Sequence, residues 1–400
     1  MHTRRQTISL FALEGVNSFG TTLYFYYLYF FTEKQFGFTK FQNLILASAL
    51  GLNYGIGSII GGRFAQRRGY FAALKTGYAI MAVVLGIGGF SQSLSVHLAI
   101  MFVAMFGMAL TWPALEALTS ESGSHDDLPR NVGIYNLVWG GLGAVAYFCG
   151  GAIFEAATFR AMFLLPAGIH IVQLLWAIAL QHSGGRSVRN APQRNSEMQD
   201  DRQISTNEPE QLHSPVSPKT FLRMAWLANP FAYLAINTVI ALTPTLATRL
   251  HLSLVQAGVL CSTWLFVRTA SFLWLWLWPG WHYRFRWLMT AYVALTISFV
   301  AMLLGNHVWI VIVAQIFFGL ALGLIYYSSL YYSMHVGETK GEHGGFHEAM
   351  IGAGNCIGPA IGASALWFFP SHPSSSTWAV MVLLSCGFAG LLSLRFKSPR

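Results

Sequence analysis

The chain has 400 residues, of which 54% are hydrophobic and only 10% are charged. Soluble domains carry about 25% charged residues, so this composition excludes an ordinary soluble protein and predicts an integral membrane protein. The net charge of +9 suits a nucleic-acid partner by its sign alone, but the placement of the basic residues, described below, indicates membrane topology and no nucleic-acid partner.

Apolar runs of membrane-spanning length, about 20 residues, occur twelve times, which predicts an all-α protein with twelve transmembrane helices. They begin near Ser9, Phe41, Phe71, Val96, Val132, Ala161, Phe221, Leu254, Trp287, Val308, Gly345 and Thr377. The first run lacks the small-residue cleavage pattern of a signal peptide, so we expect it to be retained as a helix. The four cysteines lie in separate runs, which argues against a disulfide framework.

The first run carries a polar stripe. Glu14, Asn17, Thr21 and Tyr24 share one helical face, and we expect that face to line a cavity. Burial of a carboxylate favours its neutral form, so Glu14 is a candidate proton carrier. The alternative is a static pair with a cation such as Arg268.

The loop after the second run is basic and contains glycine. It reads Gly62-Arg-Phe-Ala-Gln66-Arg67-Arg68-Gly69 and is a candidate gating motif.

A sequence segment returns after a constant shift of 212 residues, which indicates an internal duplication. The matched pairs are Phe106 and Phe318, Gly107 and Gly319, Leu118 and Leu330, Gly133 and Gly345, and Gly140 and Gly352. Each copy holds six of the apolar runs. The unit is therefore a six-helix bundle used twice, an arrangement typical of secondary transporters.

The duplicated segments contain candidate substrate-binding residues. Trp112 and Glu116 lie one turn apart near the cytoplasmic end of the fourth run, and Glu348 is expected in the first turn of the eleventh; we expect both carboxylates near an aqueous boundary. Asn136, Trp139 and Gly143 share one face, as do Glu348, Gly352 and Asn355. These faces either line a central cavity or form hydrogen bonds between helices.

One long polar stretch divides the chain. Residues 182–220 are rich in Ser, Pro, Gln, Asn, Asp and Arg, a composition that favours disorder. We therefore expect an N-terminal six-helix bundle at 1–181, a cytoplasmic linker at 182–220 and a C-terminal six-helix bundle at 221–400.

Arg268 is the one basic residue near the middle of a spanning run. A buried Arg costs roughly 2.5–3.5 kcal/mol in a spanning helix, so we expect a carboxylate near it. Trp264 lies on the same face. The open alternatives are a static ion pair between the halves, direct contact with substrate, and snorkelling towards lipid.

Aromatic residues fill the first and tenth runs, and Tyr27 and Tyr327 are candidates for stacking on a ring of the solute. The segment from His335 to Glu348 is rich in His and Glu. Its His343 and His347 have the spacing of zinc ligands, but the neighbouring glycines are expected to break the helix, so we predict no metal site.

Basic residues are distributed asymmetrically. With both termini in the cytoplasm, nineteen of the 24 Lys and Arg fall on the cytoplasmic side, and the opposite side receives Lys34, Lys40, Arg160 and Arg249. This bias predicts the orientation.

Twelve helices in two sets of six, the central linker and the Gly62–Gly69 loop together resemble the major facilitator superfamily. In the loop Gln66 replaces the acidic residue of the family pattern, which helps to latch the cytoplasmic gate. A second family pattern, associated with the fifth helix of antiporters, occurs here in the eleventh run as Gly354, Gly358 and Pro359, where we read it as packing and bending.

The resemblance implies a monomeric secondary transporter of the inner membrane, in contact with lipid, that moves a small organic solute by alternating access. We expect proton coupling and no cofactor. No nucleotide-binding loop of the P-loop type is present, so direct ATP hydrolysis has no support. The alternative is a non-transporting membrane enzyme or sensor that uses the 335–348 segment.

Overall fold

The computed structural model describes residues 4–120, 128–184, 217–336 and 340–397, and these contain helices and no strand. In the first half the helices are α1 (Arg4–Phe25), α2 (Leu28–Phe36), α3 (Lys40–Arg68), α4 (Tyr70–Gly88), α5 (Leu94–Ser120), α6 (Leu128–Ala157) and α7 (Arg160–Gly184). In the second half they are α8 (Pro218–Arg249), α9 (Leu254–Cys261), α10 (Thr263–Leu277), η4 (Pro279–Trp281), α11 (Phe285–Leu304), α12 (Val308–Val336), α13 (Lys340–Phe368) and α14 (Ser375–Lys397).

Each predicted apolar run contains a helix, and two runs contain a break. The first run divides into α1 and α2 at Tyr26 and Tyr27, and the eighth divides into α9 and α10 at Ser262. Among the described residues, eleven helical stretches are long and apolar enough to cross a membrane. The stretch of α1 is not among them, since polar residues such as Glu14 and Asn17 lower its mean hydropathy.

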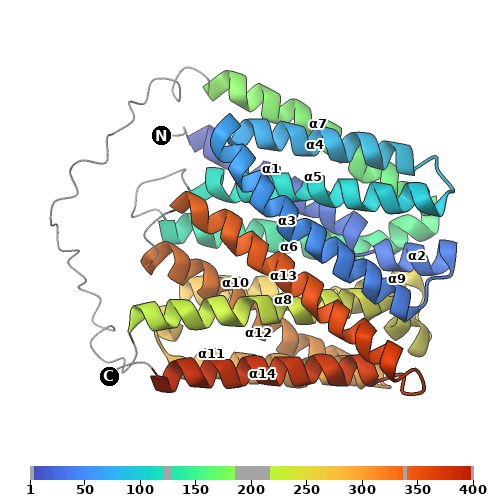
Figure 1. The fold of residues 1–400 in the computed structure, drawn as a ribbon. Coiled ribbons are helices and arrows are strands. Elements are labelled where there is room, and N and C mark those ends of the chain that lie inside the picture. The colour runs from blue at the N-terminus through green and yellow to red at the C-terminus, as the bar shows by residue number, and fades with distance from the viewer. Residues whose placement is uncertain (1–3, 121–127, 185–216, 337–339, 398–400) are drawn as a thin grey trace.

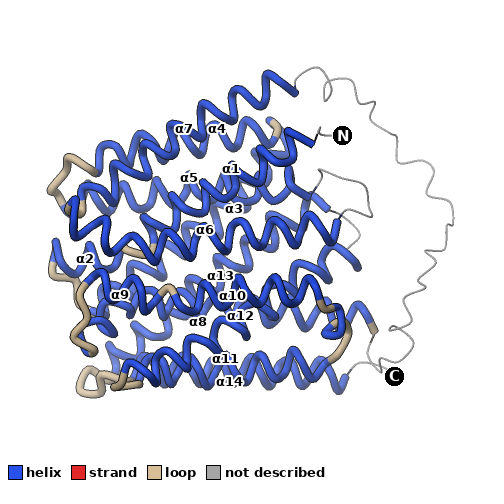
Figure 2. Tube along the Cα trace, turned by 180° about the vertical axis from the view of Figure 1, so that it is seen from behind, coloured by secondary structure: helices blue, strands red, loops and turns tan. Residues whose placement is uncertain are grey.

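The N-terminal helices form one side of the bundle and the C-terminal helices the other (Figure 1). α1, α3, α4, α5, α6 and α7 pack among themselves, as do α8 and α10–α14. The described N- and C-terminal ends lie at the same end of the bundle, as the reverse view confirms (Figure 2). The predicted linker falls mostly on residues 185–216, outside the described part of the chain, so the domain boundaries stay a prediction.

The N-terminal caps of two helices are also related by the duplication. Thr39 caps α3 in a reciprocal capping box with Gln42, and Ser253 caps α9 in the same way with Gln256. Both pairs are related by a shift of 214 residues. Side-chain oxygens at these positions satisfy the free N–H groups of the first helical turn. The α9–α10 pair is therefore the counterpart of α3, two residues out of register with the 212-residue shift.

Two helix crossings join the halves: α3 packs along α13, and α6 packs along α9 and α10. In the first crossing, a Cβ atom on Gly352 would collide with the main chain of Gly55. In the second, a Cβ atom on Gly140 would lie 2.9 Å from Oγ1 of Thr269. These contacts are duplicates of each other, because Gly352 matches Gly140 and Gly55 matches Thr269 at the two shifts.

The halves close against each other at the end of the bundle far from the termini. Phe41 stacks on Trp367 with ring centroids 5.9 Å apart, and the Lys40 ammonium donates to the carbonyl oxygen of Pro373. The main-chain N–H of Val255 donates to Oε1 of Glu155 at 3.1 Å. All three contacts connect one half with the other.

The start of α13 differs from the prediction. The helix begins at Lys340 and continues through the glycines that were expected to break it. Glu348 therefore lies about two turns inside the helix rather than in its first turn. Packing against α3 and α8 stabilises α13 along its length and outweighs the weak helix propensity of glycine.

Candidate functional site

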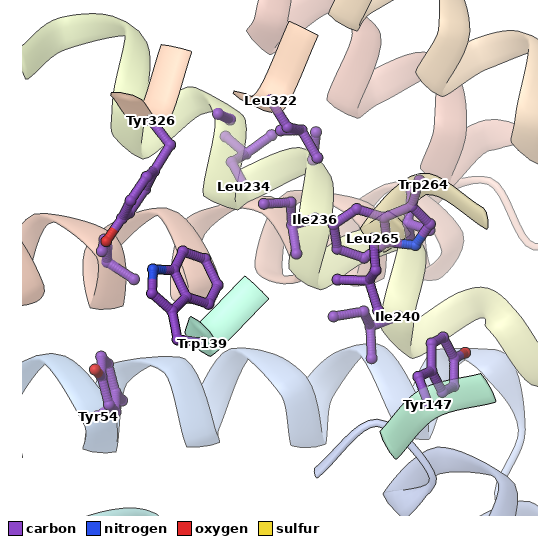
Figure 3. Close-up of a cluster of buried hydrophobic side chains, with 14 of the residues drawn as sticks. Tyr54, Trp139, Tyr147, Leu234, Ile236, Ile240, Trp264, Leu265, Leu322 and Tyr326 are labelled. Carbon is purple, nitrogen blue, oxygen red and sulfur yellow. The ribbon is translucent and has the colours of Figure 1, made fainter. Parts of the chain in front are cut away.

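A cavity of about 160 Å³ lies between the two halves. Its aromatic wall consists of Phe25, Tyr26, Tyr29, Tyr54, Trp112, Trp139, Tyr233 and Tyr326. Tyr54, Trp139 and Tyr326 approach this space from α3, α6 and α12 (Figure 3). Among its described lining residues, Arg268 and Glu348 are the charged ones. The site thus has an aromatic interior with one positive and one negative group.

Arg268 is held by aromatic rings. Its guanidinium carbon lies 4.5 Å from the ring centre of Trp139, 5.1 Å from that of Trp264 and 5.9 Å from that of Phe272. Cation–π contacts of this kind are worth about 2 kcal/mol when desolvated. Trp139 belongs to the other half, so the contact spans the interface.

Arg268 is buried without an anionic partner. Only 4% of the residue is exposed and its Nε has no hydrogen-bond acceptor, although the Tyr26 hydroxyl interacts with the guanidinium. Within the described ranges no carboxylate forms an ion pair with it. The expected static ion pair is therefore absent there, and the structure leaves the charge of Arg268 directed at the cavity.

Glu348 provides the negative group on the opposite wall. The Tyr54 hydroxyl of α3 donates a hydrogen bond to Oε2 of Glu348 on α13. Glu348 is 5% exposed, so it lies in the protein interior and not at an aqueous boundary as expected. The helix begins earlier than predicted, which places this carboxylate at the depth of the cavity.

The neighbouring polar residues have structural hydrogen bonds. Trp139 donates through Nε1 to Oδ1 of Asn136 at 3.0 Å, which orients the indole that covers Arg268. The Asn237 amide donates to the main-chain oxygen of Asn355 at 2.7 Å. Trp139, Gly143 and Asn355 line the cavity, whereas Asn136 is fully buried behind it. Both predicted faces thus contribute to the cavity lining, whereas interhelical hydrogen bonds occur at α13 and the Asn136 bond lies within α6.

Glu14 lies away from the central cavity. Of the predicted stripe on α1, Thr21 lines the cavity, whereas Glu14 and Asn17 point into the N-terminal half. Both carboxylate oxygens of Glu14 and both amide atoms of Asn17 are buried without hydrogen-bond partners. Packing of α1 against α6 and α7 sets this rotation. The expectation that the whole stripe lines one cavity was therefore wrong.

Buried polar groups surround Glu14. Its carboxylate is within electrostatic range of Glu116, Glu348 and the Tyr78 hydroxyl. Tyr78 of α4 stacks on His170 of α7, with ring centroids 6.0 Å apart. Several of these buried polar atoms have no hydrogen-bond partner.

Tyr135 on α6 is a further buried residue within electrostatic range of Glu14. Its hydroxyl also interacts electrostatically with Tyr326, Glu116 and Glu348. Glu116 is buried at 7% exposure rather than placed at the boundary. Tyr135 was not predicted from the sequence, although it occupies the duplicate position of His347.

Tyr27 and Tyr327, the residues predicted to stack on a ring of the solute, do not line the cavity. Tyr27 is fully buried and its hydroxyl donates to the Tyr147 carbonyl oxygen at 2.5 Å, and Tyr327 packs on Trp281. The adjacent Tyr26 and Tyr326 line the cavity instead. Tyr54, Tyr233 and Asn237 were also missed. The shift of 214 residues offers a signal for Tyr54, since it places Tyr54 on Arg268.

The sequence pattern of the Major Facilitator Superfamily matches residues 10–359 of this chain. The chain belongs to the Major Facilitator Superfamily. Its fold is also that of solved transporters, and no curated protein matches the sequence significantly.

Two solved structures illustrate the fold of this superfamily member. A bacterial homologue of the human lysosomal transporter Spinster, inward-facing and unoccupied, has 14% identity and a TM-score of 0.64; the match covers 98% of this chain and 96% of that one. The human organic anion transporter MFSD10 (TETRAN) has 12% identity and a TM-score of 0.66, with 98% and 100% covered. At these identities the likeness concerns the fold.

In this superfamily member the Gly62–Gly69 motif forms the end of α3 and the turn into α4. Gln66, Arg67 and Arg68 are exposed, and Gly69 alone separates the two helices with φ of +91°, a backbone conformation that favours glycine. Its role in gating stays a prediction.

The second predicted motif lies where α13 packs on α8. A Cβ atom on Gly354 or Gly358 would collide with the carbonyl oxygens of Pro230 or Leu234, and Pro359 lies within α13. These glycines allow close packing inside the C-terminal half, in agreement with the packing interpretation.

The metal alternative falls largely outside the described side chains. His347 is described and is buried beside Tyr326, with ring centroids 5.8 Å apart. His335, Glu338, Glu342 and His343 are not covered. Among the described residues no group of three or more potential metal ligands occurs.

A larger hollow of about 880 Å³ lies between α11 and α12. Its lining is almost entirely apolar and includes the exposed Trp309, Val313 and Phe317. In a membrane protein such a surface faces lipid tails. Its lining residues carry no charge, whereas the smaller central cavity contains Arg268 and Glu348.

Proposed function

We propose that this transporter moves a small organic solute across the inner membrane by alternating access, with both termini in the cytoplasm. The observation that carries the proposal is Arg268, a buried cation without an ion-pair partner among the described residues, in a cavity that both halves line. A substrate anion or polar group would supply the missing partner. Interactions of this kind between a guanidinium and an anion are strong and directional.

The two crossings between the halves support the rocking step. Both use close contacts of small residues, which allow one bundle to tilt against the other around the cavity. The halves meet at the end far from the termini, so this arrangement fits a state in which that end is closed.

Proton coupling through Glu14 rests on its surroundings. A carboxylate with two unpartnered oxygens in a protein interior is costly when charged and much less so when protonated. Glu14 lies within electrostatic range of Glu348, which lines the cavity, so a change in the charge of Glu14 would alter the electrostatic environment of Glu348. Movement of a proton on or off Glu14 would thereby be linked to the occupancy of the cavity.

The test begins with a thermal-shift screen of purified protein against sugars, organic acids, amino acids, nucleosides and cationic drugs. A ligand at a hundred times its Kd stabilises the fold by about 2.7 kcal/mol. Hits are then assayed for uptake in proteoliposomes with wild type, Arg268→Ala and the control Arg286→Ala, which alters an exposed arginine at the start of α11.

We expect Arg268→Ala to abolish binding and uptake in a monodisperse protein, and Arg286→Ala to behave as wild type. Intact uptake in Arg268→Ala would remove this residue from the site. The enzyme or sensor alternative predicts instead that a combined His343→Ala and His347→Ala substitution removes function while Arg268→Ala does not.

A further inference from the structure

The central cavity presents two opposite charges that do not neutralise each other. Arg268 and Glu348 are the charged residues among its described lining, and they form no ion pair together. They belong to different crossings: Arg268 lies on α10 beside α6, and Glu348 lies on α13 beside α3. The two charges of the lining therefore sum to zero, but the positive group lies on one wall of the cavity and the negative group on the other.

Each charge is held in place on its own wall. Rings from both halves enclose the guanidinium of Arg268, and the Tyr54 hydroxyl donates to the carboxylate of Glu348. A hydroxyl that donates leaves the carboxylate as an acceptor, the arrangement that suits an ionised group. Since both groups are held apart, mutual pairing would require both walls to rearrange.

A ligand with a single charge would pair with only one of the two charged residues, Arg268 or Glu348. An anion alone would pair with Arg268 and leave Glu348 buried beside a second negative charge. A cation alone would leave Arg268 unpaired. Leaving a buried charge without a partner carries a substantial penalty. A ligand with both charges satisfies the two walls together and keeps the occupied cavity neutral.

We propose that the cavity binds a small zwitterion, with its anionic group at Arg268, its cationic group at Glu348 and an apolar or aromatic body against the tyrosine and tryptophan rings. This inference rests on the transport function proposed above and names its substrate class. The cavity volume of about 160 Å³ is below the 300–1,000 Å³ typical of sites for drug-sized ligands, which limits the body to a small solute.

The test uses two sets of probes that differ only in charge. The first set is phenylalanine, 3-phenylpropionate and 2-phenylethylamine, with adjacent charges in the zwitterion. The second is 6-aminohexanoate, hexanoate and hexylamine, with separated charges. Calorimetric titration of purified wild type measures the Kd of each. We expect one zwitterion to bind at least about tenfold more tightly than both of its single-charge analogues.

Two neutral variants then assign the charges to the walls. In Arg268→Gln the zwitterion and its amine analogue should bind equally, because the carboxylate no longer has a partner. In Glu348→Gln the zwitterion and its acid analogue should bind equally. If Glu348→Gln does not give a monodisperse protein, Glu348→Asp replaces it, and the advantage over the acid should then fall without vanishing.

Three results would overturn the inference: an acid or amine that binds wild type as tightly as its zwitterion, an advantage that survives both substitutions, or no binding by any of the six probes. Counterflow in proteoliposomes distinguishes failure of the proposed substrate class from failure of the proposed transport function. Exchange of a single-charge probe without exchange of zwitterions leaves the transport function intact and removes the substrate class. Zwitterion binding with the expected charge dependence but no exchange supports the ligand class and contradicts the transport function.

Discussion

The crossing of α3 with α13 and the crossing of α6 with α10 are copies of one arrangement that have diverged in chemistry. At both, a glycine of the fifth or eleventh predicted spanning run approaches the opposite half. In the first crossing Tyr54 faces Glu348; in the second Arg268 and Asn136 occupy the same two positions. The close packing is common to both crossings, but the polar residues at the matched positions differ. The cavity therefore has a negative group at one crossing and a positive group at the other.

The comparison also separates two kinds of buried charge. Glu348 has a hydroxyl donor and lines the cavity, whereas Glu14 has no hydrogen-bond partner and is fully buried in the N-terminal half. The first is suited to hold a ligand and the second to change its protonation. The following predictions test these differences in order of expected effect.

Asn136→Glu would make α6 resemble α13 at the duplicated position. We expect the new carboxylate to pair with Arg268 and to weaken binding of the best ligand about 100-fold, or about 2.7 kcal/mol. Calorimetric titration measures the affinity, and the melting temperature should not fall. Asn136→Gln is the uncharged control of the same length. Affinity within threefold of wild type in Asn136→Glu would show that the two crossings are not equivalent at this position.

Gly352→Ala and Gly140→Ala compare the tightness of the two crossings. The added methyl group meets main-chain atoms of Gly55 in the first case and the side-chain oxygen of Thr269 in the second. Overpacking costs about 1–3 kcal/mol, and main chain yields less readily than a side chain. We expect Gly352→Ala to lower the melting temperature more than Gly140→Ala does.

Gly362→Ala serves as the control for this pair, because its new methyl group would find only ordinary contacts of 3.4 Å and longer. Equal melting temperatures for Gly352→Ala and Gly362→Ala would contradict the importance of close packing at α3 and α13.

Glu14→Gln removes the titratable group while retaining the shape of the buried side chain. We expect uptake in proteoliposomes to lose its dependence on pH, with rates at about pH 6 and about pH 8 within twofold of each other, because glutamine cannot bind the coupling proton. Glu33→Gln, at the far end in α2, should keep the pH profile of wild type. A wild-type profile in Glu14→Gln would eliminate this residue as the proton carrier.

Tyr54→Phe removes only the hydroxyl that holds Glu348. One hydrogen bond contributes about 1 kcal/mol, so we expect about a fivefold loss of affinity for a ligand that uses Glu348. Tyr292→Phe is a suitable control, since its hydroxyl donates to the main-chain oxygen of Leu384 outside the cavity. Equal affinities in Tyr54→Phe and wild type would mean that Glu348 keeps its position without Tyr54.

Much of the fold and part of the site were accessible from sequence. Apolar runs located the membrane-length helices of the described residues, and the 212-residue shift correctly paired α5 with α12 and α6 with α13. Arg268, Trp139, Trp112, Glu348 and Asn355 do line the cavity. They were identified because a polar or aromatic residue deep in a spanning helix is costly unless it faces a cavity or a partner.

The remaining site residues depended on helix rotation and helix ends. The periodicity of α1 correctly grouped Glu14 with Asn17, but it left open whether that face turns to the cavity or to α6 and α7. The sequence indicated Tyr27, whereas the structure places Tyr26 in the cavity lining, beside the break between α1 and α2. One residue corresponds to about 100° of rotation, so small differences decide which ring reaches the ligand.

The sequence by itself determined the membrane class, the helices, their duplication and the presence of costly buried charges, because these follow from local composition and spacing. The tertiary structure decided which charges share a space. Arg268 and Glu348 meet across one cavity only because α10 and α13 are brought there by their crossings with α6 and α3, and Glu14 is separated from it by the rotation of α1 within its own bundle.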